Sequence, residues 1–176
     1  MSDQSDYAPL AADDFRLAFR NHPAGVGIVT ADSGNGPVAM TVSSVSSVSI
    51  DPPALVFSAS ALSSSTPTIL DAETVVVHLV TAENQQLAQL GATSGVDRFG
   101  PDVEWDRLPT GEPYYPQVQS WLRGKIAQII DVNGSYLIIV EAIGSNPHLE
   151  GSLSEVHPLV YHNRTWHRLD DSSRID

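Results

Sequence analysis

Short runs of β-branched and apolar residues, divided by turn-forming residues, recur along this chain of 176 residues. We predict strands at 25–31, 37–43, 54–60, 74–80, 119–131, 136–143, 158–162 and 165–169. Tight turns divide three pairs of these runs: the segment DSGNG at 32–36, Asn133-Gly134 and Asn163-Arg164. An Asn-Gly pair between two such runs is the strongest short hairpin signal that a sequence offers. The chain is therefore predicted to be mainly β, with antiparallel pairing.

Helical patterns are few and short. Phe15 and Phe19 stand at helical spacing in a segment that Pro23 closes, and two more helices are expected around 64–71 and 82–90. A doubly wound fold would need strands that alternate regularly with long helices, and these are missing. Many short strands with few helices predict a closed antiparallel barrel.

The length and the continuous pattern fit one domain, which we place at 13–170, between a flexible arm at 1–12 and a tail at 171–176. Nine basic residues against 21 acidic ones give a formal net charge of −12, which repels nucleic acid and anionic lipid. The chain has no cysteine and no apolar run near the roughly 20 residues that a membrane helix needs. We expect a cytoplasmic protein that binds neither nucleic acid nor a membrane.

Two suggestive patterns are outweighed by their context. GNGPVA at 34–39 fits the glycine fingerprint of dinucleotide-binding folds, but Pro37 and the β-rich run behind it cannot form the helix that this fingerprint requires. His157, His162 and His167 lie close together in the sequence, but no suitably spaced carboxylate completes a metal-binding set. We expect no metal site.

The segment at 41–66 holds ten serines among small and apolar residues. Its apolar residues, such as Val45, Val48 and Phe57, are interleaved too regularly for a flexible serine linker, so we expect the segment to be structured. Hydroxyl and backbone N–H groups on strands with small side chains suit a flat heteroaromatic ring with carbonyl and imine edges. The alternative is a serine-rich barrel surface that only resists aggregation.

Four hydroxyl residues lie at the start of the helix expected to end near Asp71: Ser63, Ser64, Ser65 and Thr66. Such residues commonly cap a helix, but hydroxyls and free N–H groups that converge there also suit an anion. A mononucleotide with its ring on the serine strands and its phosphate here would use both features. Arg98 would supply positive charge and Phe99 an apolar wall, although an arginine in a surface loop fits the spacing equally well.

The combination of four motifs resembles the flavin reductase-like family with the FMN-binding split-barrel fold, over residues 13–169. The motifs are FRNHPAGVGIVTA, GPVAMTVSSVSSVSIDPPALVFSAS, SSST and PLVYHNRTWHRL. They are most similar to the small reductase components of two-component flavin monooxygenases. The resemblance implies an antiparallel split β-barrel of Greek-key type with a few short helices, and a homodimer.

The resemblance also implies cofactors and site residues. Members of this family bind FMN or FAD, reduce it with NADH or NADPH and often release reduced flavin to a partner monooxygenase. By position, the residues implied to line the isoalloxazine and ribityl chain are Thr41, Ser43, Ser44, Ser58 and Ala59. Those implied to hold phosphate are Ser63, Ser64, Ser65 and Thr66, with Arg98 of the Asp-Arg-Phe segment.

The chain departs from the family pattern at the turn before the strand at 136–143. Many relatives have Gly-Asp-His there, with the histidine beside the nicotinamide, whereas this chain has Gly134, Ser135 and Tyr136, and Glu141 replaces a later glycine. Tyr136 and, less so, His78 are our candidates for the nicotinamide face, with ordinary packing as the alternative. We expect no catalytic side chain, because hydride passes directly between stacked rings.

We therefore predict an FMN reductase that uses NADH or NADPH, with FAD as a possible cofactor. Two alternatives stay open: an FMN carrier or sensor without reductase turnover, and a split-barrel oxidoreductase with a deazaflavin reductant. Loss of the histidine would account for the first alternative.

Overall fold

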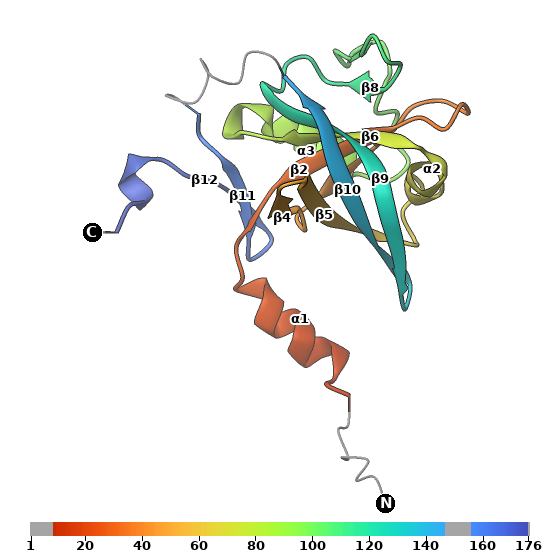
Figure 1. Cartoon of the computed structure of the whole chain (residues 1–176). Helices are drawn as coiled ribbons and strands as arrows, with labels where there is room; N and C mark the ends of the chain where they lie inside the picture. Colours follow the sequence, from red (N-terminus) through yellow and green to blue (C-terminus); the bar gives the residue numbers. More distant parts are fainter. Residues whose placement is uncertain (1–8, 147–155, 176) are drawn as a thin grey trace, which may run out of the picture.

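One seven-stranded antiparallel sheet, strongly curled, forms the body of the molecule in the computed structural model (Figure 1). The structure describes residues 9–146 and 156–175. The strands of this sheet are β2 (Gly27–Ala31), β3 (Val38–Val42), β4 (Ser46–Ile50), β5 (Pro53–Ser60), β6 (Thr74–Leu79), β9 (Ser120–Val132) and β10 (Ser135–Ser145). Their spatial order is β3-β2-β6-β9-β10-β5-β4.

Smaller elements surround this sheet. A three-stranded sheet contains β1 (Ala24–Gly25), β11 (Leu159–His162) and β12 (Thr165–Arg168), and a two-stranded one contains β7 (Asp106–Arg107) and β8 (Pro113–Tyr114). The helices are α1 (Ala12–Arg20), α2 (Thr66–Asp71), η1 (Ala82–Asn84), α3 (Gln85–Ala92) and η4 (Asp171–Ser173). The predicted mainly β composition with a few short helices is confirmed.

The predicted hairpins form because their turns have the required chemistry. Asn133 (φ 47°) and Gly134 (φ 89°) connect β9 to β10, and Asn163 (φ 48°) and Arg164 (φ 62°) connect β11 to β12. Two consecutive positive φ angles match the right-handed twist of the flanking strands. Every strand predicted from the sequence is present, with ends shifted by a few residues at most.

Within the described residues, no backbone ladder joins the edge strands β3 and β4, so the barrel is split and not closed. Instead, the Ser58 backbone N–H donates to Ser44 Oγ at 2.9 Å, which joins β5 to the connection between β3 and β4. The strand β4 was not predicted. Its side chains are largely exposed and many are serines, so it lacks the apolar alternation on which strand prediction depends.

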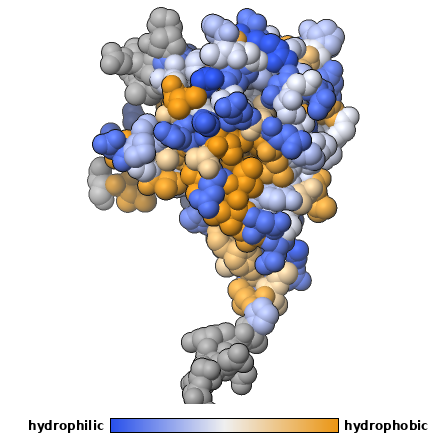
Figure 2. All heavy atoms as spheres, turned by 45° about the vertical axis from the view of Figure 1, so that its right-hand side comes forward, coloured by the Kyte–Doolittle hydropathy of each residue, from blue (hydrophilic) through white to orange (hydrophobic). Residues whose placement is uncertain are grey.

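Helix α1 lies away from the barrel, and none of its residues is buried (Figure 1). Phe15, Leu17 and Phe19 are each more than half exposed. Figure 2 shows apolar side chains gathered over one face of the barrel and continuing toward α1. The C-terminal end of α1 is fixed, because Asn163 N donates to Arg20 O at 3.0 Å.

Among the described residues, no helix has both the length and the apolar character that crossing a membrane requires.

Candidate functional site

A surface groove of about 420 Å³ lies where β3, β5, α3 and the loop before α2 meet. We call it the serine groove. Hydroxyl side chains supply much of its lining, together with one guanidinium group. Its lining residues are Met40, Thr41, Val42, Ser43, Ser44, Ser58, Ser60, Ser63, Ser64, Gly91, Ala92, Ser94, Arg98 and Ser135.

Arg98 is held in place by three hydrogen bonds within the protein. Its Nη1 donates to Ser65 Oγ at 3.2 Å, Nη2 to Thr93 O at 2.7 Å, and Nε to Leu90 O at 3.4 Å. A guanidinium group has five N–H donors, so one on each terminal nitrogen stays free for a ligand. A fixed positive charge with two free donors therefore faces the serine groove.

Two members of the predicted phosphate set lie beneath the groove. Ser65 and Thr66 are both 1% exposed. Ser65 Oγ donates to Ala39 O at 2.8 Å, and Thr66 Oγ1 donates to Ser60 O at 2.7 Å. Their hydroxyl protons are thus used inside the fold, and Ser63 and Ser64 are the members of this set that line the groove.

Most residues predicted to bind the ring lie on β3 or β5 or in the connection after β3, and they line the same groove. Thr41, Ser43, Ser44 and Ser58 all line it. Thr41 Oγ1 donates to Ala88 O at 2.7 Å, which joins β3 to α3. Small side chains on both strands leave room for a flat ring to approach the backbone.

The serine groove fits a flavin mononucleotide in its donor chemistry. Hydroxyls of Ser63, Ser64 and Ser94, with the free donors of Arg98, suit a phosphate group. The helix α2 has only six residues, so these side chains and not its N-terminus are the relevant donors. When flavin is bound, the residues that would hold the ring are those on β3, on β5 and in the connection that follows β3.

Two predicted cofactor residues face elsewhere. Ala59 is completely buried in the core beside Phe57 and Ile138, because alternate residues of β5 point inward. Phe99 stacks on Tyr115, with ring centroids 5.5 Å apart and an interplanar angle of 12°. Neither Ala59 nor Phe99 therefore lines the serine groove.

His78 does not fit the predicted position at the nicotinamide face. It is completely buried, its Nδ1–H donates to Ile28 O at 3.0 Å, and its Nε2 accepts a hydrogen bond from Tyr115 N at 3.1 Å. Burial lowers the pKa of His78 from 6.5 to about 4, against the opposite effect of its backbone hydrogen bonds. It is a neutral structural histidine with no exposed surface for a ligand.

Tyr136 lies apart from the serine groove. It packs against the core and lines a separate hollow beside α2 with Leu70 and Asp71. Its neighbour Ser135, opposite Ser60 in the register of β10 and β5, lines the serine groove instead. Because successive side chains of a strand point to opposite faces, Ser135 lies at the serine groove and Tyr136 does not.

Seven lining residues were not predicted: Met40, Val42, Ser60, Gly91, Ala92, Ser94 and Ser135. Ser60 follows Ser58 at the spacing of a strand face, so period-two alternation along β5 could have identified it. Gly91 allows α3 to approach β3 closely, since a Cβ there would overlap Thr41 Oγ1. No signal in the sequence places Ser94 near β3.

The described residues contain no group of three side chains that could bind a metal ion. His162 and His167 have ring centroids 5.6 Å apart, whereas His157 Nδ1 lies 3.3 Å from Glu83 Oε1. These three histidines thus do not form one cluster.

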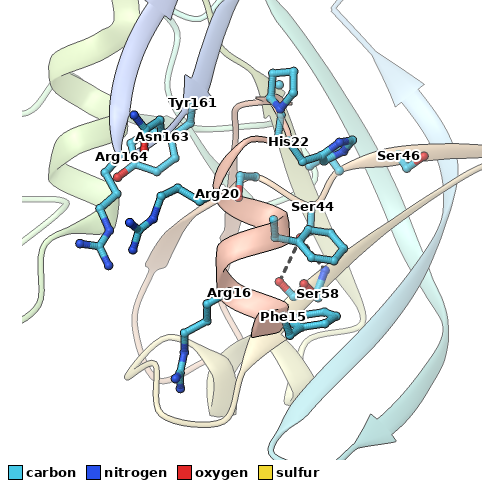
Figure 3. A pocket seen from close by; sticks show the side chains of 16 residues that line it. Phe15, Arg16, Arg20, His22, Ser44, Ser46, Ser58, Tyr161, Asn163 and Arg164 are labelled. Carbon is cyan, nitrogen blue, oxygen red and sulfur yellow. Dashed lines mark hydrogen bonds between the residues drawn. The ribbon is translucent and has the colours of Figure 1, made fainter. Parts of the chain in front are cut away.

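A second, larger groove of about 830 Å³ continues from the first, and both are lined by Ser43, Ser44 and Ser58 (Figure 3). Residues of α1, β1 and the β11–β12 hairpin form its other walls. Phe15 lies on the same side of α1 as Ser44 and Ser58 in Figure 3. Two ligands can therefore meet at these shared serines.

Comparison with known proteins assigns this architecture. The flavin reductase like domain model matches residues 19–170. The NADH:FMN oxidoreductase of Rhodococcus erythropolis is 40% identical over 159 residues, which cover 90% of this chain and 82% of that protein. The reductase subunit of stachydrine N-demethylase from Rhizobium meliloti is 30% identical over 126 residues, covering 71% and 54%.

Among solved structures, a flavin reductase domain protein from an Arthrobacter species matches with a TM-score of 0.84 and 30% sequence identity. The match covers 94% of this chain and 98% of that one. The predicted fold, an antiparallel split barrel, and the predicted family are both confirmed. This chain belongs to the flavin reductase-like family.

Proposed function

We propose that this protein binds FMN in the serine groove and reduces it with a nicotinamide dinucleotide. The observation that carries this proposal is the meeting of the two grooves at Ser43, Ser44 and Ser58. A flavin phosphate beside Arg98 would place its ring toward this junction, where a second ring can stack on it. The relatedness to an NADH:FMN oxidoreductase favours FMN and NADH as the pair.

When bound, flavin would supply the redox chemistry by taking up a hydride from the reduced nicotinamide. The protein has to bind and orient the two rings, since correct orientation alone removes much of the barrier. Ser63, Ser64 and Arg98 anchor the flavin, and the shared serines position the ring edge. Direct hydride transfer between two rings oriented in this way requires no acid or base side chain.

A direct test is NADH oxidation measured with and without added FMN at catalytic protein concentration. The proposal predicts NADH consumption that depends on FMN and saturates with it. NADH consumption that is the same without protein would contradict it.

A second candidate is an FMN carrier without reductase turnover. The observation that favours it is that no imidazole lines the serine groove in the described part of the chain, because His78 is buried and Tyr136 replaces the family histidine. Tight FMN binding without NADH oxidation is the result that this candidate predicts.

We infer further that the protein is a cytoplasmic homodimer that supplies reduced flavin to a partner monooxygenase. Exposed apolar side chains on β4, β9, β10 and α1 support self-association, since monomers rarely expose large contiguous apolar patches. The open, surface position of the serine groove suits release of reduced flavin. The relative that is a demethylase reductase subunit illustrates such a partnership.

A further inference from the structure

Three arginines converge on the second groove: Arg16, Arg20 and Arg164. Figure 3 shows them together on one side of α1, across from Phe15, Ser44 and Ser58. We call this part the basic groove. The groove is large enough for an extended ligand, since small-molecule sites commonly occupy about 300–1,000 Å³.

This clustering is unusual for so acidic a chain. The three arginines are a third of its nine basic residues, whereas its formal net charge is −12. No carboxylate is among the residues that line the groove. Arg16 also forms an exposed ion pair with Asp13 at 2.7 Å, but Arg20 and Arg164 form none among the described residues. The guanidinium groups of Arg20 and Arg164 thus line the basic groove without an ion-pair partner among the described residues.

The backbone at Arg164 gives independent support. Arg164 has a φ of 62°, a left-handed conformation that glycine adopts at little cost and other residues do not. The corresponding position of the β9–β10 hairpin is Gly134. An arginine at a turn position that favours glycine indicates a role for its side chain, as backbone outliers do at ligand-binding sites.

The two elements that carry these arginines are joined to each other. Asn163 N donates to Arg20 O at 3.0 Å, and β1 pairs with β11 directly after Pro23. The end of α1 and the β11–β12 turn are thereby held together. These backbone contacts fix the segments that carry Arg20 and Arg164 next to each other.

We propose that the basic groove binds the phosphate groups of the nicotinamide dinucleotide, with Arg20 and Arg164 as its main ligands. This inference rests on the proposed function. A dinucleotide whose phosphates lie at these arginines can extend its nicotinamide across Ser44 and Ser58 to the flavin ring. Guanidinium groups suit phosphate because they donate two parallel hydrogen bonds with opposite charge.

The test compares Arg164→Gly and Arg20→Ala with the wild type. Each is expected to raise the KM for NADH by roughly five- to tenfold, with kcat and FMN affinity changed less than about twofold. Arg164→Gly should keep or raise the melting temperature, because glycine relieves the positive φ. Arg174→Ala, which removes a charge outside both grooves, is the matched control and should leave the KM unchanged.

Direct titration of flavin-free protein with NADH separates this inference from the proposed function. Wild-type turnover with an unchanged KM in both variants would overturn the inference and leave the function standing. NADH binding that the variants lose, without any turnover, would support the inference and contradict the function. Adenosine and pyrophosphate groups also occur in FAD, so a loss of FAD affinity with unchanged NADH affinity would assign the arginines to the flavin and overturn the proposal.

Discussion

Arg98 has two functions at the residue scale: two of its N–H groups hold the C-terminal end of α3 and a third contacts Ser65, while its remaining donors face the serine groove. Ser65 Oγ accepts a hydrogen bond from one terminal nitrogen of Arg98, and Ser63 and Ser64 line the same groove. The proposed phosphate site is therefore preorganised before any ligand arrives. A negative charge introduced at Ser63 or Ser64 should weaken binding of the phosphate group and hardly affect binding of the flavin ring.

Ser64→Asp is expected to weaken FMN binding at least about tenfold and riboflavin binding less than about twofold, because only FMN carries the phosphate. Fluorescence titration with both flavins measures the difference. Ser47→Asp, on β4 and outside both grooves, is the control for added charge. Equal losses for FMN and riboflavin would place the phosphate elsewhere.

His78 links the fold to pH. Since burial lowers its pKa to about 4, the unfolded chain binds more protons than the folded chain between pH 6.5 and about 4. The contribution of neutral His78 to the free energy of unfolding is therefore complete above about pH 6.5. It is lost as the pH falls from 6.5 to about 4. Urea unfolding should give a free energy about 2 kcal/mol lower at about pH 5 than at about pH 7.

His78→Asn should flatten this pH dependence, because asparagine has no proton to gain in that range. Its free energy of unfolding at neutral pH should also fall, since the imidazole bridges Ile28 O and Tyr115 N. A wild-type slope that survives in the variant would show that another group causes it.

At the scale of elements, α3 and β3 pack against each other and both contribute lining residues to the serine groove. Gly91 on α3 faces Thr41 on β3 so closely that a Cβ would overlap Thr41 Oγ1. Helix propensity alone predicts that Gly91→Ala stabilises the protein by about 1 kcal/mol. The contact reverses the sign, so we expect lower stability and weaker FMN binding.

Denaturant unfolding and FMN titration of Gly91→Ala test this expectation. Gly144→Ala on β10 is a suitable control, because its Cβ would make only ordinary van der Waals contact with Arg123 Cβ. Adding Thr41→Ala to Gly91→Ala should recover part of the lost stability, as a double-mutant cycle would measure. Stabilisation by Gly91→Ala alone would contradict the close packing.

The sequence was most informative where local chemistry alone decides the structure. The Asn133-Gly134 turn predicted the β9–β10 hairpin because its conformation depends on two residues. The face on which a side chain lies depends on register with a distant strand, so Ser135 and Tyr136 could not be told apart. Burial of Ser65 and Thr66 likewise depends on contacts with β3 and β5 that lie far away in sequence.

At the scale of the whole molecule, apolar surface and net charge act in opposite directions on assembly. Ile130 and Leu137 are cross-strand neighbours on β9 and β10, each 37% exposed, and Ile50 at the sheet edge is 90% exposed. Burying such surface contributes about 25 cal/mol per Å², whereas like net charges repel at long range and are screened by salt. We therefore expect a dimer that high ionic strength does not dissociate.

Ile130→Lys combined with Leu137→Lys should convert the proposed dimer to a monomer, which sedimentation velocity measures. Leu169→Lys, at an apolar residue directly after β12 that is 42% exposed, is the control and should not change the sedimentation. A wild-type protein that sediments as a monomer at micromolar concentration would contradict the proposed interface.

Anaerobic reduction of FMN tests the central claim, that the joined grooves bring flavin and nicotinamide into contact. FMN in excess over the protein is mixed with NADH, and the visible absorbance of oxidised flavin is followed. The account predicts rapid, complete bleaching at catalytic protein concentration. Stoichiometric FMN binding without bleaching by NADH or NADPH would contradict it and leave the carrier as the better description.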